Sequence, residues 1–474
     1  MSQRNLSRRE MIRIMGLGAA GAALAACAPA APQIVKETVQ VPVEKIVQQT
    51  VEVSVEKVVQ QTVEVVKEVT PTPAPEGAVT IEFWQPFGEL AGEVMDSLVA
   101  EWNAANPNIQ VKATFTPNIT SAGSNPKFLA AALSGNPPDV FIHDGSSFST
   151  STALNAFTSL DDLIKGAKLD PAAFFPWAWE KVQWGGHTYG LPLETDARAL
   201  YYNKTMLEKA GFAEPPKTID ELDVMADKLT AKSGDRIDTM GFIPWMGNWF
   251  LIAWGWDWGL KVWDAAANKI NLNGKEMVEA LTWEVGYAKK YGVTSIQNFQ
   301  QGFGSGADDP FRSGKVAMQL TGNWEILSLK QYVPDLQYGI SPAPYPTGKS
   351  AMTWSGGFVT GIPQGSKHPE KAWEFVHWLC AGEGASKYAI QTQHLPTNVA
   401  AAKAFADATP EQKIFVDLLP VSFIEPVIPE WSLAWDTHLA AEQEVLFGQK
   451  TPQEALDACN AKVQEAIDIR IQGG

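Results

Sequence analysis

The sequence predicts an α/β protein of two domains, built mainly on parallel sheets and preceded by residues 1–78 of a different character. The chain has 474 residues, of which 45% are hydrophobic, and this is enough apolar material for more than one core. From Val79 onward, short apolar strands alternate with amphipathic helices. That order favours right-handed crossovers between parallel strands, which is why we expect the α/β class.

Residues 1–26 have the features of an export signal. The stretch "SRREMIRIMGLGAAGAALAAC" places arginines before an apolar run at 14–26. The run is too short for a transmembrane helix, which needs about 20 residues. Its Ser-Arg-Arg start resembles the twin-arginine export motif, and "LAAC" resembles the lipobox of lipoprotein precursors. We therefore expect a signal peptide at 1–26, lipidation of Cys27, and a protein anchored on the outer face of the cytoplasmic membrane.

Residues 27–78 predict a lipidated N-terminus followed by a linker. The segments "TVQVPVEK", "TVEVSVEK" and "TVEVVKEV" begin at Thr38, Thr50 and Thr62, so they form an internal repeat. The alternating valines favour extended chain, although the last copy also has a helical pattern. "TPTPAPEG" then interrupts regular structure. We expect a spacer that holds a domain away from the membrane, with an oligomerising stalk as the alternative.

The first elements of the globular part follow in order along the chain. "VTIEFW" at 79–84 is a strand, and 89–105 is a helix whose apolar residues lie four apart. "IQVKATFT", "PKFLAAAL" and "DVFIHD" continue as strand, helix and strand. Ligands of open parallel sheets bind beyond the carboxyl ends of the strands. The candidate binding residues at these ends are Trp84, Gln85, His143, Asp144 and Ser146.

Charge and residue content exclude several classes of function. The net charge is −16, so the protein repels nucleic acid and anionic lipid surfaces. None of the six histidines forms a metal-binding motif, and the sequence contains no phosphate-binding loop. We expect no catalytic residue, no metal and no cofactor. Cys380 and Cys459 are expected to be free thiols.

Several longer stretches carry a family resemblance. They include "LVAEWNAANPNIQVKATF", "KFLAAALSGNPPDVF", "GFVTGIPQGSKHPEKAWEFVHWL" and "QHLPTN", and the most specific are "YYNKTMLEKAGFAEPPKTIDEL" and "GKVAMQLTGNW". In this order they resemble the family 1 extracellular solute-binding proteins of ABC importers, the group that contains maltose- and glycerol-phosphate-binding proteins. The resemblance extends from Val79 almost to Gly474.

The resemblance implies a type II periplasmic-binding-protein fold, in which two α/β lobes are joined by a hinge of three crossings and enclose a cleft. By the match, the crossings fall near Leu191–Asp196, Pro310–Gly314 and Trp354–Phe358. The first lobe would take 79–193 and 315–354, and the second lobe 197–312 and 357–474. Two adjacent glycines at 356–357 suit a hinge, because glycine tolerates large changes of φ and ψ.

The same resemblance implies that the cleft captures a carbohydrate and delivers it to an ABC permease with its cytoplasmic ATPase. Sugars have apolar faces and hydroxyl rims, so aromatic rings and carboxylates make a selective site. The protein would act as a monomer, without a nucleic-acid partner, and the lipid would be its only contact with the membrane. The further expected ligand-binding residues are Glu194, Asp196, Trp245, Asn248, Trp249, Asn323, Trp324, Trp354, Ser355, Gly356, Trp431 and Trp435.

The stretch "WMGNWFLIAWGWDWG" at 245–259 is expected to divide between site and core. Its front, with Trp245 and Trp249, matches the region where the family contacts ligand. The rings at its back are expected to pack inside the lobe, where each removes a large apolar area from water. These are Trp254, Trp256 and Trp258.

Two other functions stay open at the level of sequence. Glu194 and Asp196 could act as paired acid and base in a membrane-anchored glycoside-processing enzyme, although carboxylates are equally good acceptors for sugar hydroxyls. A structural surface protein that uses the repeat as a stalk is the other possibility. A product assay would reveal the enzyme, and a ligand-induced shift in melting would exclude the structural role.

Overall fold

The computed structural model describes residues 77–117 and 125–473. All of them belong to one compact unit of the chain. The predicted signal peptide, Cys27 and the repeat lie outside the described residues. Within the described ranges, no helix is both long and apolar enough to cross a bilayer.

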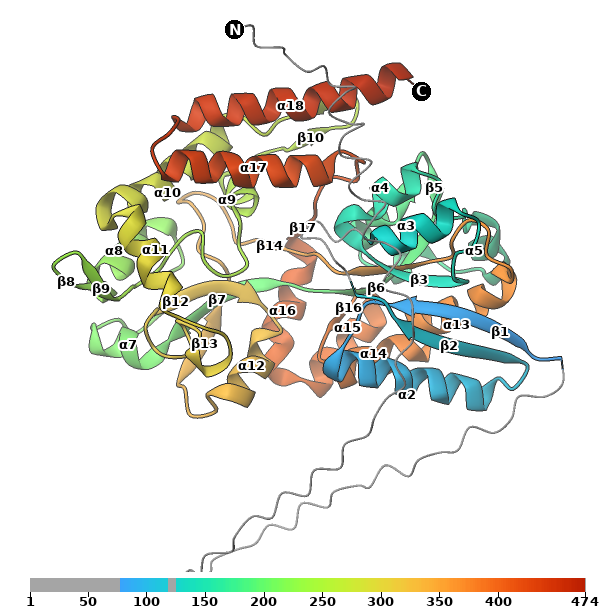
Figure 1. Ribbon diagram of the computed structural model, residues 1–474. Helices are drawn as coiled ribbons and strands as arrows, with labels where there is room; N and C mark the ends of the chain where they lie inside the picture. Colours follow the sequence, from blue (N-terminus) through green and yellow to red (C-terminus); the bar gives the residue numbers. More distant parts are fainter. Residues whose placement is uncertain (1–76, 118–124, 474) are drawn as a thin grey trace, which may run out of the picture. The chain divides into compact units, whose positions relative to one another are not determined.

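The first lobe contains a six-stranded sheet (Figure 1). Its strands are β1 (Val79–Gln85), β2 (Ile109–Phe115), β3 (Val140–Asp144), β6 (Gly190–Thr195), β15 (Phe358–Gly361) and β16 (Leu395–Pro396). They lie in the order β16-β6-β15-β3-β1-β2. β1 pairs in parallel with β2 and β3, as the strand–helix–strand pattern predicts, whereas β15 is antiparallel to β3 and β6.

Helices cover this sheet and bury its apolar residues. The four-residue spacing predicted for the first helix places Val94, Leu98 and Trp102 in the core. Phe83 of β1 meets Phe375 edge to face, with ring centroids 5.2 Å apart. The helices and the small hairpin of this lobe are α2 (Glu89–Ala105), α3 (Pro126–Leu133), α4 (Phe148–Ala153), α5 (Asp161–Ala167), α6 (Pro176–Lys181), α13 (Pro369–Ala381), α14 (Glu383–Thr392), β4 (Gln183–Trp184) and β5 (His187–Thr188).

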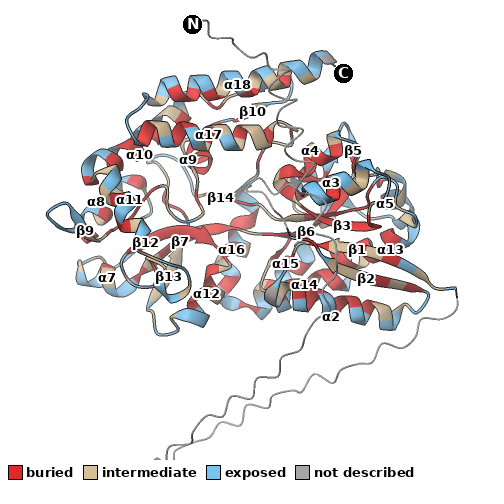
Figure 2. Cartoon of the chain, viewed as in Figure 1, coloured by how far each residue is buried: buried red, intermediate tan, exposed pale blue. Residues whose placement is uncertain are grey.

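The second lobe is built on the antiparallel sheet β12-β7-β13. These strands are β7 (Arg198–Asn203), β12 (Met318–Gly322) and β13 (Tyr338–Ser341), and β7 and β12 are almost entirely buried (Figure 2). The surrounding elements are α7 (Lys204–Lys209), α8 (Ile219–Leu229), β8 (Ala231–Ser233), β9 (Arg236–Thr239), α9 (Leu251–Trp258), β10 (Trp263–Asp264), β11 (Lys269–Ile270), α10 (Lys275–Tyr291), α11 (Val293–Gln301), α12 (Glu325–Tyr332), α17 (Trp431–Leu446) and α18 (Pro452–Gly473).

Local sequence explains where these helices begin and end. Thr218 and Glu221 form a reciprocal capping box at the start of α8, satisfying backbone donors that the helix leaves free. α9 has the sequence LIAWGWDW, and every residue except Trp258 is buried. It ends at Gly259, whose φ of 100° is favourable only for glycine.

The lobe boundaries expected after residue 314 are wrong. The segment 315–354 was expected in the first lobe, but β12 and β13 both pair with β7 of the second lobe. The segment from 357 was expected in the second lobe, but β15 and β16 belong to the first sheet, and α13 packs in the first core. Only the last part of the chain, with α17 and α18, returns to the second core.

The expected crossing at Pro310–Gly314 is also wrong, because the elements on both sides of it belong to the second lobe. The chain leaves the first sheet at Thr195, re-enters it at Phe358, and leaves it again after Pro396. The last passage runs through α15 (Val399–Ala408) and α16 (Lys413–Leu418), which share a small third core with β7 and α12. It ends in β17 (Ser422–Phe423), which pairs in parallel with β14 (Thr353–Trp354).

The two described cysteines are free, as predicted. Cys380 lies in the core of the first lobe and Cys459 in the core of the second. Burial raises the pKa of the Cys380 thiol to about 12, so it is unreactive at neutral pH.

Candidate functional site

A cavity of about 270 Å³ lies between the two lobes. The first lobe supplies the end of β3 and the start of β15, and the second lobe supplies the beginnings of α9 and α17. The two crossings at 195–198 and 354–358 form its floor. The lining residues are Asp144, Ser146, Asp196, Arg198, Asn248, Phe250, Trp354, Gly356, Gly357, Phe358, Glu425, Trp431, Ser432 and Trp435.

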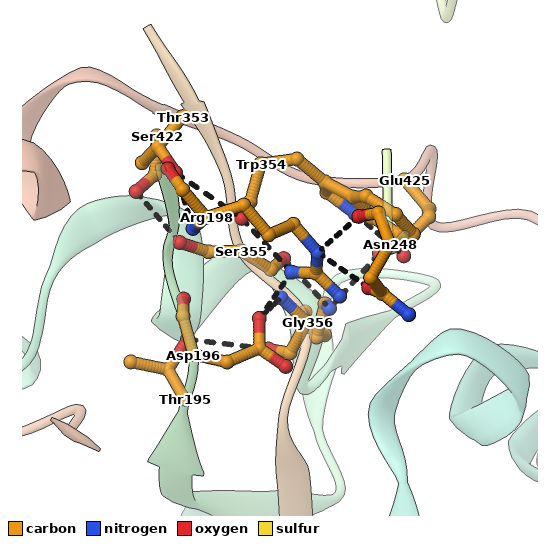
Figure 3. A network of polar contacts seen from close by, with 11 residues as sticks. Thr195, Asp196, Arg198, Asn248, Thr353, Trp354, Ser355, Gly356, Ser422 and Glu425 are labelled. Carbon is orange, nitrogen blue, oxygen red and sulfur yellow. Dashed lines mark hydrogen bonds and ion pairs between the residues drawn. The ribbon is translucent and has the colours of Figure 1, made fainter. Parts of the chain in front are cut away.

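Arg198 is the centre of a polar network in this cavity (Figure 3). Its Nε donates to Oδ1 of Asn248 at 2.8 Å, and its Nη1 donates to Asp196 and to the carbonyl of Trp354. The guanidinium Cζ also lies 3.7 Å from the ring centroid of Trp354. Charge-assisted bonds and cation–π contact thus fix this side chain and the ring against each other.

Asp196 connects the two crossings. Its Oδ1 accepts from Arg198 and from the backbone N–H of Gly356 at 2.6 Å. Oδ2 has no hydrogen-bond partner among the described residues, and about a fifth of the side chain is exposed (20%). The network leaves one carboxylate oxygen of Asp196 and the Nδ2 group of Asn248 free to bind hydroxyl groups of a ligand.

The ring of Trp354 is held from behind by a buried ion pair. Its Nε1 donates to Oε1 of Glu425 at 2.9 Å, and Oε2 of Glu425 accepts from Lys181 at 3.0 Å. Lys181 comes from the first lobe, and both partners are at least 90% buried. Phe250 and Trp435 pack against the ring, with centroids 5.8 and 5.6 Å from it. The aromatic wall is therefore fixed before any ligand arrives.

The crossing into β15 requires glycine. Gly357 has a φ of 105°, and a Cβ atom there would lie 2.1 Å from the carbonyl oxygen of Glu194. Only a residue without a side chain lets the two crossings run this close together.

Asp144 forms the first-lobe rim of the cavity. Its Oδ1 accepts from the backbone N–H of Ser146 at 2.9 Å and from the Ser146 hydroxyl. Burial raises the pKa of this carboxyl, and the hydrogen bonds from Ser146 partly oppose the effect.

The other three candidates from the strand ends lie outside the cavity. His143 is buried among phenylalanine rings; its Nε2 meets the Ser151 hydroxyl at 2.8 Å, and burial lowers its pKa to about 4. Gln85 is buried and accepts from the backbone of Phe87. Trp84 packs at the edge of the first core beneath the ammonium group of Lys127.

Four candidates near the crossings are not part of the cavity lining. Glu194 accepts from Tyr388 and contacts His394, and Ser355 bonds Ser422 through its hydroxyl. Asn323 is buried and donates to a carbonyl and to Gln412. Trp324 is half-buried, with its ring 5.6 Å from Cζ of Arg198, and is not part of the lining.

The front of the tryptophan-rich stretch is corrected to core. Trp249 is 1% exposed and meets Trp254 edge to face at 5.8 Å, while Trp245 packs partly buried against the same core. Trp254 and Trp256 are buried, as expected. Asn248, which was expected at the site, and Phe250, which was not, are the residues of the stretch that line the cavity.

Sequence reasoning missed several lining residues. The expected ligand-binding residues did not include Arg198, Phe250, Gly357, Phe358, Glu425 or Ser432. Arg198 carried a usable signal, because it follows Asp196 by two residues and an extended chain places both on one side. Glu425 lies in a loop without a periodic pattern, so its position depends on the tertiary fold.

Comparison with known proteins assigns the family. The sequence model of the bacterial extracellular solute-binding proteins matches residues 88–384. The chain belongs to this family. A putative binding protein of Brucella abortus is 30% identical over 294 residues, which are 60% of this chain and 68% of that protein. The maltotriose-binding protein of Pyrococcus abyssi is 24% identical over 411 residues, covering 84% of this chain and 83% of the relative.

Solved structures confirm the two-lobe α/β fold of type II binding proteins. The structure of CpMnBP1 with mannotriose bound has a TM-score of 0.72 and 31% identity, and the match covers 81% of this chain and all of that one. The sugar-binding protein MalE of Xanthomonas citri, at 22% identity and a TM-score of 0.70, supports the fold alone.

Proposed function

We propose that the interlobe cavity of this solute-binding protein captures a carbohydrate. The observation that carries the proposal is the pair of half-buried rings of Phe250 and Trp435, which line the cavity together with the free oxygen of Asp196 and the free amide group of Asn248. An aromatic face packs against the C–H face of a sugar, and the polar groups bind its hydroxyls. The solved relative with mannotriose bound makes a manno-oligosaccharide the first ligand to test.

A phosphate-bearing ligand fits the cavity less well. The sn-glycerol-3-phosphate-binding protein of Escherichia coli is 26% identical over 417 residues, so this ligand class needs consideration. However, the charge of Arg198 is already balanced by Asp196. The charge of Glu425 is likewise balanced by Lys181, and Asp144 adds a carboxyl group that has no ion-pair partner among the described residues. A cavity richer in carboxylates than in cations repels a dianion.

A glycoside-processing role loses its structural basis. It required Glu194 and Asp196 to face one substrate, but Glu194 is buried against Tyr388 and His394, away from the cavity. Asp196 is held by Arg198 and by the backbone of Gly356. This arrangement supports hydroxyl binding by Asp196 and a structural role for Glu194, rather than a facing acid and base.

The proposal extends to transport and location. The protein would deliver the sugar to ABC permease subunits with their cytoplasmic ATPase, as a monomer, held on the outer face of the cytoplasmic membrane by lipid on Cys27. The signal pattern at 1–26 supports export, with the twin-arginine route favoured by its Ser-Arg-Arg start.

Titration calorimetry with mannobiose, mannotriose, maltotriose and sn-glycerol 3-phosphate tests the proposal. We expect a sugar to bind, and Asp196→Asn to weaken it by about 10- to 100-fold, because a charged hydrogen bond contributes roughly 1.5–3 kcal/mol. Asp162→Asn, an exposed aspartate on α5, is the matched control and should bind like the wild type. Binding of glycerol phosphate alone would replace the carbohydrate proposal.

A further inference from the structure

The last turn of α18 reaches from the second lobe to the first. Val463 and Ile467 anchor this helix in the second core, and α17 packs along it (Figure 1). Arg470 follows in the last turn, with its guanidinium Cζ 5.6 Å from the ring centroid of Trp184. Trp184 belongs to the hairpin β4–β5 of the first lobe. A guanidinium over a tryptophan face is attracted to it electrostatically, so this pair connects the two lobes at a point outside the cavity lining.

The same guanidinium binds the residue that precedes α17. Nε of Arg470 donates to Oε1 of Glu430 at 2.6 Å, and the Glu430 side chain is only 9% exposed. A hydrogen bond between two ionised groups is stronger than a neutral one. Trp431, Ser432 and Trp435 follow in the first turns of α17 and line the interlobe cavity. Arg470 therefore fixes the end of the helix that carries three lining residues, without being one of them.

The first lobe also holds the segment next to Glu430. The hydroxyls of Ser149 and Thr150 on α4 donate to the carbonyls of Ile428 and Pro429 at 3.0 and 2.9 Å. The start of α17 is thus held from both lobes at once. Because Arg470 and Trp184 belong to different lobes, a movement that opens the cavity separates them. Their contact therefore favours the arrangement in which the lobes are close together.

We propose that Arg470 is a positioning residue for ligand binding, which through Trp184 and Glu430 stabilises the closed arrangement of the lobes and places the first turns of α17 at the cavity. Arg470 acts on the fraction of the protein that is ready to bind, and the apparent affinity changes in proportion to that fraction. The proposal rests on the proposed function for its sugar measurements, whereas the separation of the lobes can be measured without sugar.

Binding kinetics of mannotriose to the full chain test the effect on affinity. We expect Arg470→Ala to weaken binding about 3- to 10-fold, mainly through faster dissociation, because the contact forms as the lobes close on the ligand. Trp184→Ala should weaken binding as well, and the double variant should lose less than the product of the two single losses. Arg470→Lys and Trp184→Phe keep a cation and a ring, so they should bind within about twofold of the wild type. Lys462→Ala, at an exposed position on the same helix, is the matched control.

A purely structural role for Arg470 predicts different results. If the losses of Arg470→Ala and Trp184→Ala simply multiplied in the double variant, the two residues would act independently and the proposal would be wrong. The proposal would also fail if Arg470→Ala slowed association and left dissociation unchanged.

Spin labels on the two lobes supply a measurement that needs no sugar. With labels at Lys165→Cys on α5 and Lys289→Cys on α10, in the Cys27→Ser background, we expect Arg470→Ala to lengthen and broaden the distance distribution of the ligand-free chain. An unchanged distribution would overturn this inference and leave the proposed function intact. A longer distance in a protein that binds none of the tested sugars would support the inference and overturn the proposed function alone.

Discussion

At the scale of single residues, the tryptophans of the second lobe form two groups, one beside the cavity and one in the core. Trp435 and Trp354 line the cavity with centroids 5.6 Å apart, and Trp354 lies 6.4 Å from the buried Trp256. In a second group inside the lobe, Trp254 lies 5.8 Å from Trp249 and 4.7 Å from Trp283, measured between ring centroids. Trp435 is half-buried and lines the cavity, so it can contact a ligand directly, whereas the second group can act only through stability.

Substituting one ring from each group should separate these roles. Trp249→Ala should lower the free energy of unfolding by about 3–5 kcal/mol because it leaves a large cavity in the core. Trp435→Ala should instead weaken sugar binding tenfold or more, as removal of an aromatic anchor does. It should lower the free energy of unfolding less than Trp249→Ala does. Urea unfolding and calorimetry on both variants measure this. If both variants lost the same sugar affinity and kept the wild-type free energy of unfolding, the division into a core ring and a binding ring would be wrong.

The sequence showed which residues lie at the end of a strand, but not on which face of the strand each side chain lies. His143 and Asp144 are adjacent at the end of β3, and successive side chains of a strand point to opposite faces. Asp144 therefore faces the cavity while His143 enters the core. By the same alternation, the side chain of Asp196 points to the opposite side from the residues directly before and after it in the chain. No property of the residue types showed which of the two would face the ligand.

At the scale of elements, the sequence predicted the pairing of strands that are close in the chain, but not the pairing of strands that are far apart. β1, β2 and β3 follow one another with helices between them, so their parallel pairing follows from connection rules. β12 pairs with β7 although more than a hundred residues separate them. Nothing in the sequence of either strand identifies the other as its partner. In α9, apolar residues on all sides remove the periodicity that would identify a binding face.

The contact between α10 and α17 contains a pair of buried glutamates that makes stability depend on pH. Glu284 and Glu442 are almost fully buried, and burial raises the pKa of both, that of Glu442 to about 7. The native state therefore keeps a proton that the unfolded chain releases near pH 4.3. For this group, the free energy of unfolding is highest below that pH and falls as pH rises towards 7.

The variant Glu442→Gln should remove the part of that pH dependence that belongs to Glu442, because burial raises the pKa of Glu284 as well. The difference in unfolding free energy between wild type and variant should change by about 3 kcal/mol between pH 4.5 and 7.5. The comparison with the variant is necessary because His143 and His438, whose pKa values burial lowers to about 4, stabilise the fold as pH rises from about 4 to 6.5. Urea unfolding at both pH values measures it, with Glu444→Gln on the same helix as control. A constant difference would refute the buried-proton account.

At the scale of the whole molecule, the crossings connect ligand contacts to the relative position of the lobes. Asp196 bonds to Gly356, and Lys181 of the first lobe bonds to Glu425 on the path into α17. Ser149 and Thr150 of α4 donate to the carbonyls of Ile428 and Pro429 at 3.0 and 2.9 Å. A ligand between the lobes adds contacts to both, so it must favour the arrangement in which both reach it.

Spin labels on the two lobes should detect this shift directly. Lys165→Cys on α5 and Lys289→Cys on α10 are exposed sites in different lobes. With Cys27→Ser, labelling should be confined to them, because burial raises the pKa of both native thiols and makes them unreactive. We expect mannotriose to shorten and narrow the measured distance distribution, because the closed arrangement gains the contacts of Asp144 and Trp435 at once. Asp196→Asn should require about 10- to 100-fold more sugar for the same change. An unchanged distribution at a sugar concentration that calorimetry shows to be saturating would mean that the lobes do not move on binding.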